Sequence, residues 1–352
     1  MNKHLNERYG PIIENYRLKP EYIKEFGNVA KIYTKDHVFA LKTIRNDQSQ
    51  EFLNTIFSLY NLGYRKMVPI YQTFDGNYLV RNQDNYYYLM PWLEDGGNEE
   101  RTDHYKLMFK ELANLHLFSS KDASIDKSEL EQFYQSLTKK WDKRKIFLEQ
   151  YIQRCEASWF MSPFELHFCT FYHETIQAIE FGKTKLDEWY EKVKEKETSR
   201  TVVTHGKVSI RHFMFDKSGS GSFISFENSK VAFPIYDLVS FYYRTLRTYP
   251  KQCDECIEWL ETYQEVYPLS EEEQLLFLSL LSFPEPIYRS VKKHINKTSQ
   301  KNVRNDVKNL QKSYWLIKNV EYFVMRIIAE QQKQEQQKQE QQKQEQQKES
   351  HT

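Results

Sequence analysis

The pattern of apolar residues changes near Pro91, and this change limits the folds that the chain can adopt. Between Ile23 and Met90, short runs rich in β-forming residues alternate between apolar and polar side chains, which is typical of half-buried strands. After Pro91 the apolar residues recur at helical spacing over longer segments. The sequence therefore predicts a β-rich N-terminal part and a larger helical part, each long enough to bury a core.

The β-rich part contains one helical segment. The predicted strands cover residues 23–33 with a bend at Gly27, then 37–44, 68–74, 78–80 and 86–90. Helical spacing from Glu51 to Leu62 predicts a helix that Gly63 can end.

In the second part, long helices surround a short β-rich segment. Helices are predicted at 103–118, 128–156, 164–196 and 303–328, and another begins at Ser270, which with Glu273 forms a capping-box signature. The β-rich segment covers residues 201–227 and contains a turn at 218–222. Residues 331–352 repeat Gln, Lys and Glu without apolar side chains, which predicts either disorder or a solvated continuation of the last helix. A Gln-rich interaction tail is possible, but a repeat expansion without function is favoured.

Composition narrows the classes of partner. Among 352 residues, 50 Lys+Arg balance 49 Asp+Glu, so no charge footprint for nucleic acid or an anionic membrane is present. Residues 1–20 lack the apolar core of a signal peptide, and the longest apolar run, 275–283, is too short for a bilayer. We expect a soluble chain made in the cytoplasm, without a transmembrane segment. The 25 Tyr and 23 Phe should be mostly core, although a surplus suits packing into an assembly.

The four cysteines are Cys155, Cys169, Cys253 and Cys256. Cys253 and Cys256 form a Cys-x-x-Cys pair at the start of a helical pattern, but no second pair completes a zinc motif. We interpret them as one buried and one half-exposed thiol rather than as a redox or metal site. So few cysteines fit a reducing compartment.

Several short motifs recur in a defined order along the chain. They are Phe39-Ala40-Leu41-Lys42, Tyr87 to Leu93, Leu112 to His116, His205-Gly206 after Val202-Val203, Ile224 to Glu227, and Tyr236 to Phe241. Together they resemble the aminoglycoside phosphotransferase and choline kinase-like superfamily over about residues 20 to 320. Within it, the chain looks most like spore-coat proteins of the CotS type, found in endospore-forming relatives of Bacillus.

The resemblance implies an α+β, protein-kinase-like two-lobed fold. A small antiparallel β-lobe would span residues 1–91, a larger, mostly helical lobe 92–330, and the low-complexity tail 331–352. Lys42 would be the phosphate-binding lysine, and Gly27 would lie in the loop that covers the phosphates. Glu51 is the only carboxylate in the next helix, but its position near the helix start suits the helix dipole as well as a pair with Lys42.

The resemblance fails at the positions that carry the chemistry. Lys207 stands where the family has the aspartate that accepts the substrate proton, and a lysine does not accept a proton at neutral pH unless its pKa falls far. His212 stands where an asparagine holds Mg²⁺, although its nitrogen suits zinc better. Ser225 replaces the main metal carboxylate with a neutral hydroxyl.

We interpret Glu227 as a secondary acid of this motif whose metal partner has been lost, and two alternatives remain. If residues 224–227 form a strand, Glu227 points to the same face as Ser225 and could bind a metal in its place. Alternatively, Lys207 fills the magnesium position and pairs with Glu227. His205, His116 and Asp237 are interpreted as architectural residues of this superfamily.

These residues and the resemblance lead to one main hypothesis and two alternatives. The main hypothesis is a catalytically degenerate, kinase-fold structural or assembly component of the bacterial spore coat. Such a protein would be synthesised in the mother-cell cytoplasm, deposited in the coat, partnered by other coat proteins and independent of cofactors. The alternatives are an active phosphotransferase that uses ATP and Mg²⁺ on a small hydroxylated or amino-bearing substrate, and a pseudokinase in which Lys42, Gly27 and Glu227 form a vestigial nucleotide site.

Overall fold

In the computed structural model, the described residues are 3–45, 49–93, 101–216, 219–248, 252–296 and 303–349. They form two compact units. Unit 1 comprises residues 1–122, 200–237 and 262–268, and unit 2 comprises residues 123–199, 238–261 and 269–352. The lobe boundary predicted after residue 91 falls inside unit 1, and Ser218 of the predicted turn lies outside the described residues.

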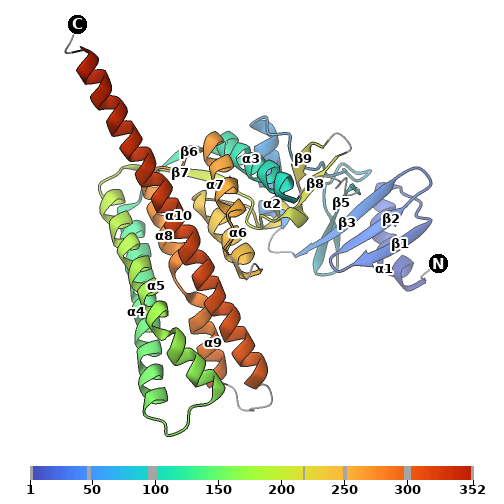
Figure 1. The fold of residues 1–352 in the computed structure, drawn as a ribbon. Coiled ribbons are helices and arrows are strands. Elements are labelled where there is room, and N and C mark those ends of the chain that lie inside the picture. Colours follow the sequence, from blue (N-terminus) through green and yellow to red (C-terminus); the bar gives the residue numbers. More distant parts are fainter. Residues whose placement is uncertain are drawn as a thin grey trace. The chain divides into compact units, whose positions relative to one another are not determined.

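A five-stranded antiparallel sheet forms one side of unit 1, in the order β1-β2-β3-β5-β4 (Figure 1). Its strands are β1 (Tyr22–Phe26), β2 (Val29–Tyr33), β3 (Val38–Arg45), β4 (Val80–Asn82) and β5 (Asn85–Pro91). The predicted bend at Gly27 is confirmed. Gly27 has a φ of +59° in the two-residue turn between β1 and β2, a conformation that glycine adopts without strain.

The N-terminal helix α1 (Lys3–Ile13) completes the core on this sheet, although no helix was predicted there. Its buried Tyr9, Ile12 and Ile13 pack into a cluster with Ile23, Ala30, Ile32, Leu41, Tyr87 and Leu89. The sequence signal is weak because Pro11 lies inside the helix and charged residues surround the few apolar ones.

The strand predicted over residues 68–74 is wrong. Within residues 68–74 the only pairing is a single-residue bridge between Tyr71 and Leu89. Pro69 has no N–H to donate and disfavours a regular ladder.

The rest of unit 1 surrounds the motif at His205-Gly206. Its elements are α2 (Ser49–Asn61), α3 (Arg101–Ser119), η3 (Ile210–His212), β8 (Phe213–Phe215), β9 (Gly221–Phe223), η4 (Phe226–Asn228) and β10 (Lys230–Ala232). Strand β7 (Thr198–Thr204) lies between β10 and β6 (Lys121–Ser124), while β8 and β9 form a separate ribbon. Helix α2 packs on η4, and α3 packs on η3 and β9, so helices support both turns that carry the motif.

Unit 2 is a helical array. Its helices are α4 (Lys127–Glu156), α5 (Pro163–Val193), α8 (Glu271–Ser282), α9 (Glu285–Ile295) and α10 (Val303–Glu349). Helix α5 packs on α4, α8 and α10 (Figure 1). Helices α6 (Ile235–Thr248) and α7 (Glu255–Val266) contribute residues to both units. The predicted capping box of Ser270 and Glu273 is confirmed at the start of α8.

Two further predictions, for the low-complexity tail and for the cysteine pair, can be compared with the structure of unit 2. Helix α10 continues to Glu349, so the low-complexity tail continues the last helix. The interpretation of Cys253 and Cys256 as one buried and one half-exposed thiol is wrong, because both are buried, at 5% and 0% exposure. None of the described helices has an apolar stretch long enough to span a membrane.

Candidate functional site

The loop at His205-Gly206 is held by one buried carboxylate. Asp237, in the first turn of α6, accepts the backbone N–H of His205 at 2.6 Å and that of Gly206 at 2.8 Å. Nε2 of the buried His116 lies 3.3 Å from the same carboxylate, and Nδ1 of His116 contacts the Tyr263 hydroxyl at 2.7 Å. Because every member is hydrogen-bonded, the network fixes the loop in the interior of unit 1.

His205 is fixed by backbone groups on both sides of its ring. Its Nε2 lies 2.8 Å from the carbonyl of Ile224, which can only accept, so Nε2 carries the proton. Its Nδ1 then accepts the N–H of Lys207 at 3.2 Å. Burial lowers the pKa of His205 and keeps the ring neutral. These contacts agree with the architectural roles expected for His205, His116 and Asp237.

Gly206 cannot be replaced by a larger residue without movement. Its φ is +74°, and a Cβ atom at this position would lie 2.1 Å from the carbonyl oxygen of Asn228 in η4. The loop after β7 and the turn after Ser225 therefore touch backbone to backbone. This contact brings the two chemical segments of the motif together.

Lys42 and Glu227 form the central ion pair of the site. Lys42 Nζ lies 2.7 Å from Glu227 Oε1, and their side chains are only 14% and 7% exposed. The Tyr88 hydroxyl, on the neighbouring strand β5, donates a hydrogen bond to the same carboxylate. The acidic partner of Lys42 is therefore Glu227 and not Glu51, which is exposed. The alternative in which Lys207 pairs with Glu227 is wrong.

The two charges stabilise each other against burial. Burial would raise the pKa of the Glu227 carboxyl, but the Lys42 ammonium and the Tyr88 hydroxyl outweigh it and hold that pKa below its usual value. Burial lowers the pKa of Lys42, an effect to which the charge of Lys207 adds and which Glu227 partly offsets. The 2.7 Å contact between the two groups is that of an ion pair.

Ser225 occupies a special backbone position. Its φ and ψ are 74° and 51°, in the left-handed region, and η4 begins directly after it. The strand assumed for residues 224–227 is therefore wrong. The expectation that Glu227 points to the same face as Ser225 depended on that strand and is also unsupported. Lys42 Nζ nevertheless donates to Ser225 Oγ at 2.5 Å, so one ammonium binds both side chains.

Lys207 and His212 contribute no carboxylate or amide oxygen. The exposed ammonium of Lys207 makes no ion pair with any residue that the structure describes. His212 Nδ1 lies 2.9 Å from the carbonyl of Lys207, so Nδ1 carries the proton and Nε2 keeps its lone pair. Burial lowers the pKa of His212 to about 4.

These residues do not fit a magnesium site. Mg²⁺ needs several oxygen ligands in near-octahedral geometry. Glu227 is the carboxylate of the Lys42 cluster, and it is already bound by Lys42 and Tyr88. Within the described ranges, no group of three or more His, Cys, Asp or Glu residues is arranged to hold a metal.

An apolar cavity of about 240 Å³ adjoins the ion pair. It is lined by Phe26, Val29, Ala40, Met90, Pro91, Trp92, Leu93, Arg211, Met214 and Ile224. Ala40 is two residues before Lys42 on β3 and so shares its face of the sheet, and Ile224 directly precedes Ser225. Phe26 and Val29 flank the Gly27 turn, but Gly27, Lys42 and Glu227 are not themselves among the residues that line the cavity.

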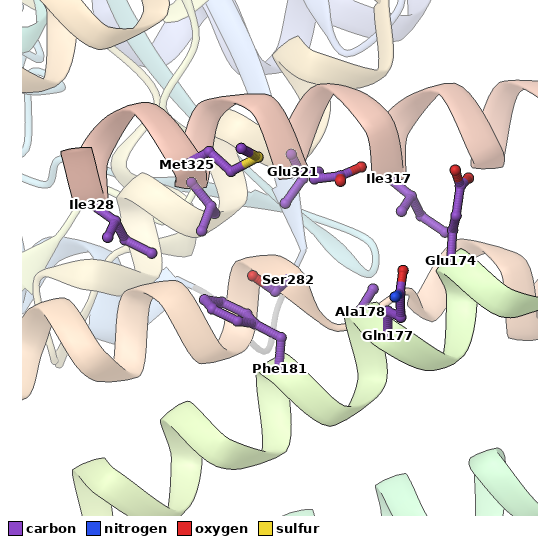
Figure 2. A pocket seen from close by; sticks show the side chains of 11 residues that line it. Glu174, Gln177, Ala178, Phe181, Ser282, Ile317, Glu321, Met325 and Ile328 are labelled. Carbon is purple, nitrogen blue, oxygen red and sulfur yellow. The ribbon is translucent and has the colours of Figure 1, made fainter.

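A second cavity, of about 230 Å³, lies within unit 2 between α5, α8 and α10 (Figure 2). Phe181, Met325 and Ile328 line its apolar end, and Glu174 and Glu321 lie toward the other end. Lys318 pairs with both carboxylates, at 3.3 and 2.5 Å. None of the motif residues lines this cavity.

Comparisons with known proteins agree with this geometry. The sequence model of the phosphotransferase enzyme family matches residues 28–275. A comparison with curated proteins finds no match.

Solved structures share the fold at low sequence identity. An aminoglycoside phosphotransferase from Alicyclobacillus acidocaldarius aligns with a TM-score of 0.72 at 14% identity, covering 90% of this chain and 94% of that one. Spectinomycin phosphotransferase in complex with AMP aligns at 0.57 and 11% identity, covering 90% and 97%. A microcompartment-associated aminopropanol kinase aligns at 0.51 and 13% identity, covering 88% and 95%. The predicted α+β kinase-like fold, with an antiparallel sheet and a larger helical part, is confirmed.

Proposed function

The chain belongs to the phosphotransferase enzyme family, and from this premise we propose that it is a member that does not transfer phosphate and acts as a structural or assembly component of the bacterial spore coat. The proposed absence of phosphate transfer is carried by the pairing of Lys42 with Glu227, with Lys207 at the position of the proton acceptor.

The charges of two side chains support the proposed absence of phosphate transfer. Phosphoryl transfer needs Mg²⁺ on the phosphates and a group that takes the proton of the attacking hydroxyl. Lys207 is an exposed cation and cannot take that proton at neutral pH. The neighbouring His212 has a pKa of about 4, which makes it a weak base.

The proposed role in the spore coat rests on the resemblance of the sequence to CotS-type spore-coat proteins. The site supports it indirectly, because a scaffold with its loop fixed by Asp237 can persist without turnover. The protein would be made in the mother-cell cytoplasm and deposited in the coat. Its partners would be other coat proteins, and it would need no cofactor for this role.

The catalytic half is tested by measuring Mg²⁺-dependent ATP turnover of the full chain, with Lys42→Ala as the matched control. Turnover indistinguishable from that of the Lys42→Ala protein supports the proposal. Turnover above background that Lys42→Ala abolishes overturns it.

Restoration is a second test. The triple variant Lys207→Asp, His212→Asn and Ser225→Asp places a carboxylate at the position of the proton acceptor, and an amide and a carboxylate at the two metal positions. The left-handed backbone of residue 225 accommodates aspartate, which tolerates this region. We expect the triple variant to gain Mg²⁺-dependent nucleotide binding in calorimetry. No gain would mean that the assignment of these positions is wrong.

The coat half is tested with a fluorescent fusion of the full chain followed during sporulation of a spore-forming host. Fluorescence that collects around the forespore and stays with purified spore coats supports the proposal. Fluorescence that remains diffuse in the mother cell overturns it, whatever the result of the turnover assay.

Nucleotide binding is a second candidate function, with or without phosphate transfer. The apolar cavity near Lys42 favours it, because such a cavity can take a flat base and a lysine ammonium can bind phosphate. Thermal melts with ATP, ADP or AMP, each with and without Mg²⁺ or Mn²⁺, decide it. Stabilisation without turnover supports a nucleotide-binding pseudokinase, stabilisation with turnover an active phosphotransferase, and no stabilisation excludes both.

A further inference from the structure

Cys253 and Cys256 lie closer together than their spacing alone suggested. Their Sγ atoms are 2.8 Å apart, and the Cys256 thiol donates to the sulfur of Cys253. Both cysteines belong to unit 2 and are buried. Two thiols in such contact are within reach of a covalent bond without a large movement.

The two cysteines flank the start of a helix. Helix α7 begins at Glu255, and the carbonyl of Asp254 accepts the N–H of Ile257 at 2.9 Å. Cys253 therefore precedes the first turn, and Cys256 lies within it. Residues three apart on a regular helical turn have Cβ atoms about 5 to 6 Å apart, whereas a disulfide needs about 3.5 to 4.5 Å. Closing the bond therefore requires a local shift of about 1 Å or more, and Cys253 can supply it because it lies before the helix begins.

Neighbouring helices hold this turn in place. The Tyr242 hydroxyl of α6 donates to the carbonyl of Cys256 at 2.9 Å. The Tyr322 hydroxyl of α10 donates to the Asp254 carboxylate at 2.5 Å, and Arg326 reaches the same oxygen at 3.4 Å. Two neighbouring helices, α6 and α10, therefore hold the backbone and the Asp254 side chain of this turn.

We propose that Cys253 and Cys256 are a peroxide-sensitive pair that closes an intramolecular disulfide and locks the first turn of α7. In the first step, the Cys253 thiolate attacks one peroxide oxygen. The S–O bond forms, the O–O bond breaks, and hydroxide leaves, which takes up the thiol proton as water. In the second step, the Cys256 sulfur attacks the sulfenic sulfur of Cys253, and the hydroxyl leaves as a second water. Two thiols and one hydrogen peroxide give one disulfide and two waters.

The order of the two steps follows from the asymmetry of the pair. Cys256 Sγ donates to Cys253 Sγ at 2.8 Å, so Cys253 is the acceptor of the pair. This hydrogen bond lowers the pKa of Cys253, although the Glu255 carboxylate, 3.2 Å from the Cys253 sulfur, opposes the effect. The same hydrogen bond together with burial raises the pKa of Cys256. The thiolate is the reactive form, so Cys253 reacts first.

The test treats the folded full-length protein with hydrogen peroxide, blocks remaining thiols with an alkylating reagent, and maps the peptides by mass spectrometry. We expect the peptide that holds Cys253 and Cys256 to lose two hydrogens, to escape alkylation, and to recover both alkylations after dithiothreitol. Full alkylation of both cysteines after peroxide would overturn the proposal. This peptide map of the wild-type protein needs no variant.

Single variants test the order of reaction. In Cys256→Ser, a sulfenic acid should accumulate at Cys253 and be trapped by dimedone. In Cys253→Ser, trapping at Cys256 should be much weaker. Equal trapping in both variants would overturn the assigned order. Cys155→Ser/Cys169→Ser is the matched control, because it removes the other two thiols and must leave the Cys253–Cys256 disulfide unchanged.

Discussion

Lys42 Nζ contacts Glu227 Oε1 at 2.7 Å, across two segments that are far apart in the sequence. Lys42 lies on β3, and Glu227 lies on the short η4 helix. The ion pair thereby ties the five-stranded sheet to the turn that follows Ser225. Together with Tyr88, it engages the Glu227 carboxylate within the protein.

Removing one partner should destabilise the protein strongly. Lys42→Met would leave the buried Glu227 without its counter-charge, which costs about 3 to 5 kcal/mol when a buried pair is broken. We expect the free energy of unfolding, measured by urea denaturation at neutral pH, to fall by about that much.

The double variant Lys42→Met/Glu227→Gln is the matched control. Because it removes both charges, it should recover a large part of the loss. Additive losses in the two single variants would show that the two side chains do not interact in solution.

Gly206→Ala should damage the fold more than other glycine substitutions at positive φ. A Cβ at residue 206 meets the Asn228 carbonyl at 2.1 Å, whereas Gly76, with a φ of +81°, has open space around the same atom. Backbone strain alone costs about 1 kcal/mol, and the clash adds about 1 to 3 kcal/mol. Gly206→Ala should therefore lower the melting temperature clearly more than Gly76→Ala. Equal shifts would contradict the backbone contact.

Asp237→Asn should loosen the loop at residues 205 and 206. An amide has one oxygen to accept hydrogen bonds, whereas the carboxylate uses both oxygens for the two N–H groups. A buried donor left without a partner costs about 1 to 3 kcal/mol. Hydrogen exchange of both amides should accelerate in the variant. Asp216→Asn, in an exposed turn, is the control and should leave these amides protected.

The stability of the protein should depend on pH through His212. Its pKa is about 4 in the folded chain, below the value of about 6.5 in an unfolded one. Between these values the unfolded chain binds the proton and the folded chain does not, so stability falls as the pH drops from 6.5 toward 4.

His212→Asn should reduce that slope by at most about 1.4 kcal/mol per pH unit. Urea denaturation at several pH values between 4 and 7 measures it. His37→Asn, in an exposed turn, provides the control slope. An unchanged slope in His212→Asn would contradict the lowered pKa.

Most of the fold could be predicted from the sequence because periodicity is a local signal. The long helices and the strands around Gly27 and Lys42 follow from apolar spacing and from glycine at a positive φ. Helix α1 and the irregular segment 68–74 were missed, because tertiary packing on the sheet decides them. Prolines lie in both, at Pro11 and Pro69.

The site was predicted only in part. The motif order identified Lys42, Gly27 and Glu227, but neither the bond between Lys42 and Glu227 nor the role of Tyr88 has a sequence signature. The left-handed turn at Ser225 converted an assumed strand into a helical turn and changed the direction of Glu227. Contacts between distant segments decide such geometry, and spacing along the chain does not report them.

The fixation of the 205–206 loop by Asp237 has an evolutionary consequence. The side chains of Asp237 and His205 hold the loop, while the side chain of residue 207 makes no ion pair with any described residue. Selection for a folded protein therefore acts weakly on residue 207. The side chain at residue 207 can therefore differ among related chains without loss of the folded loop.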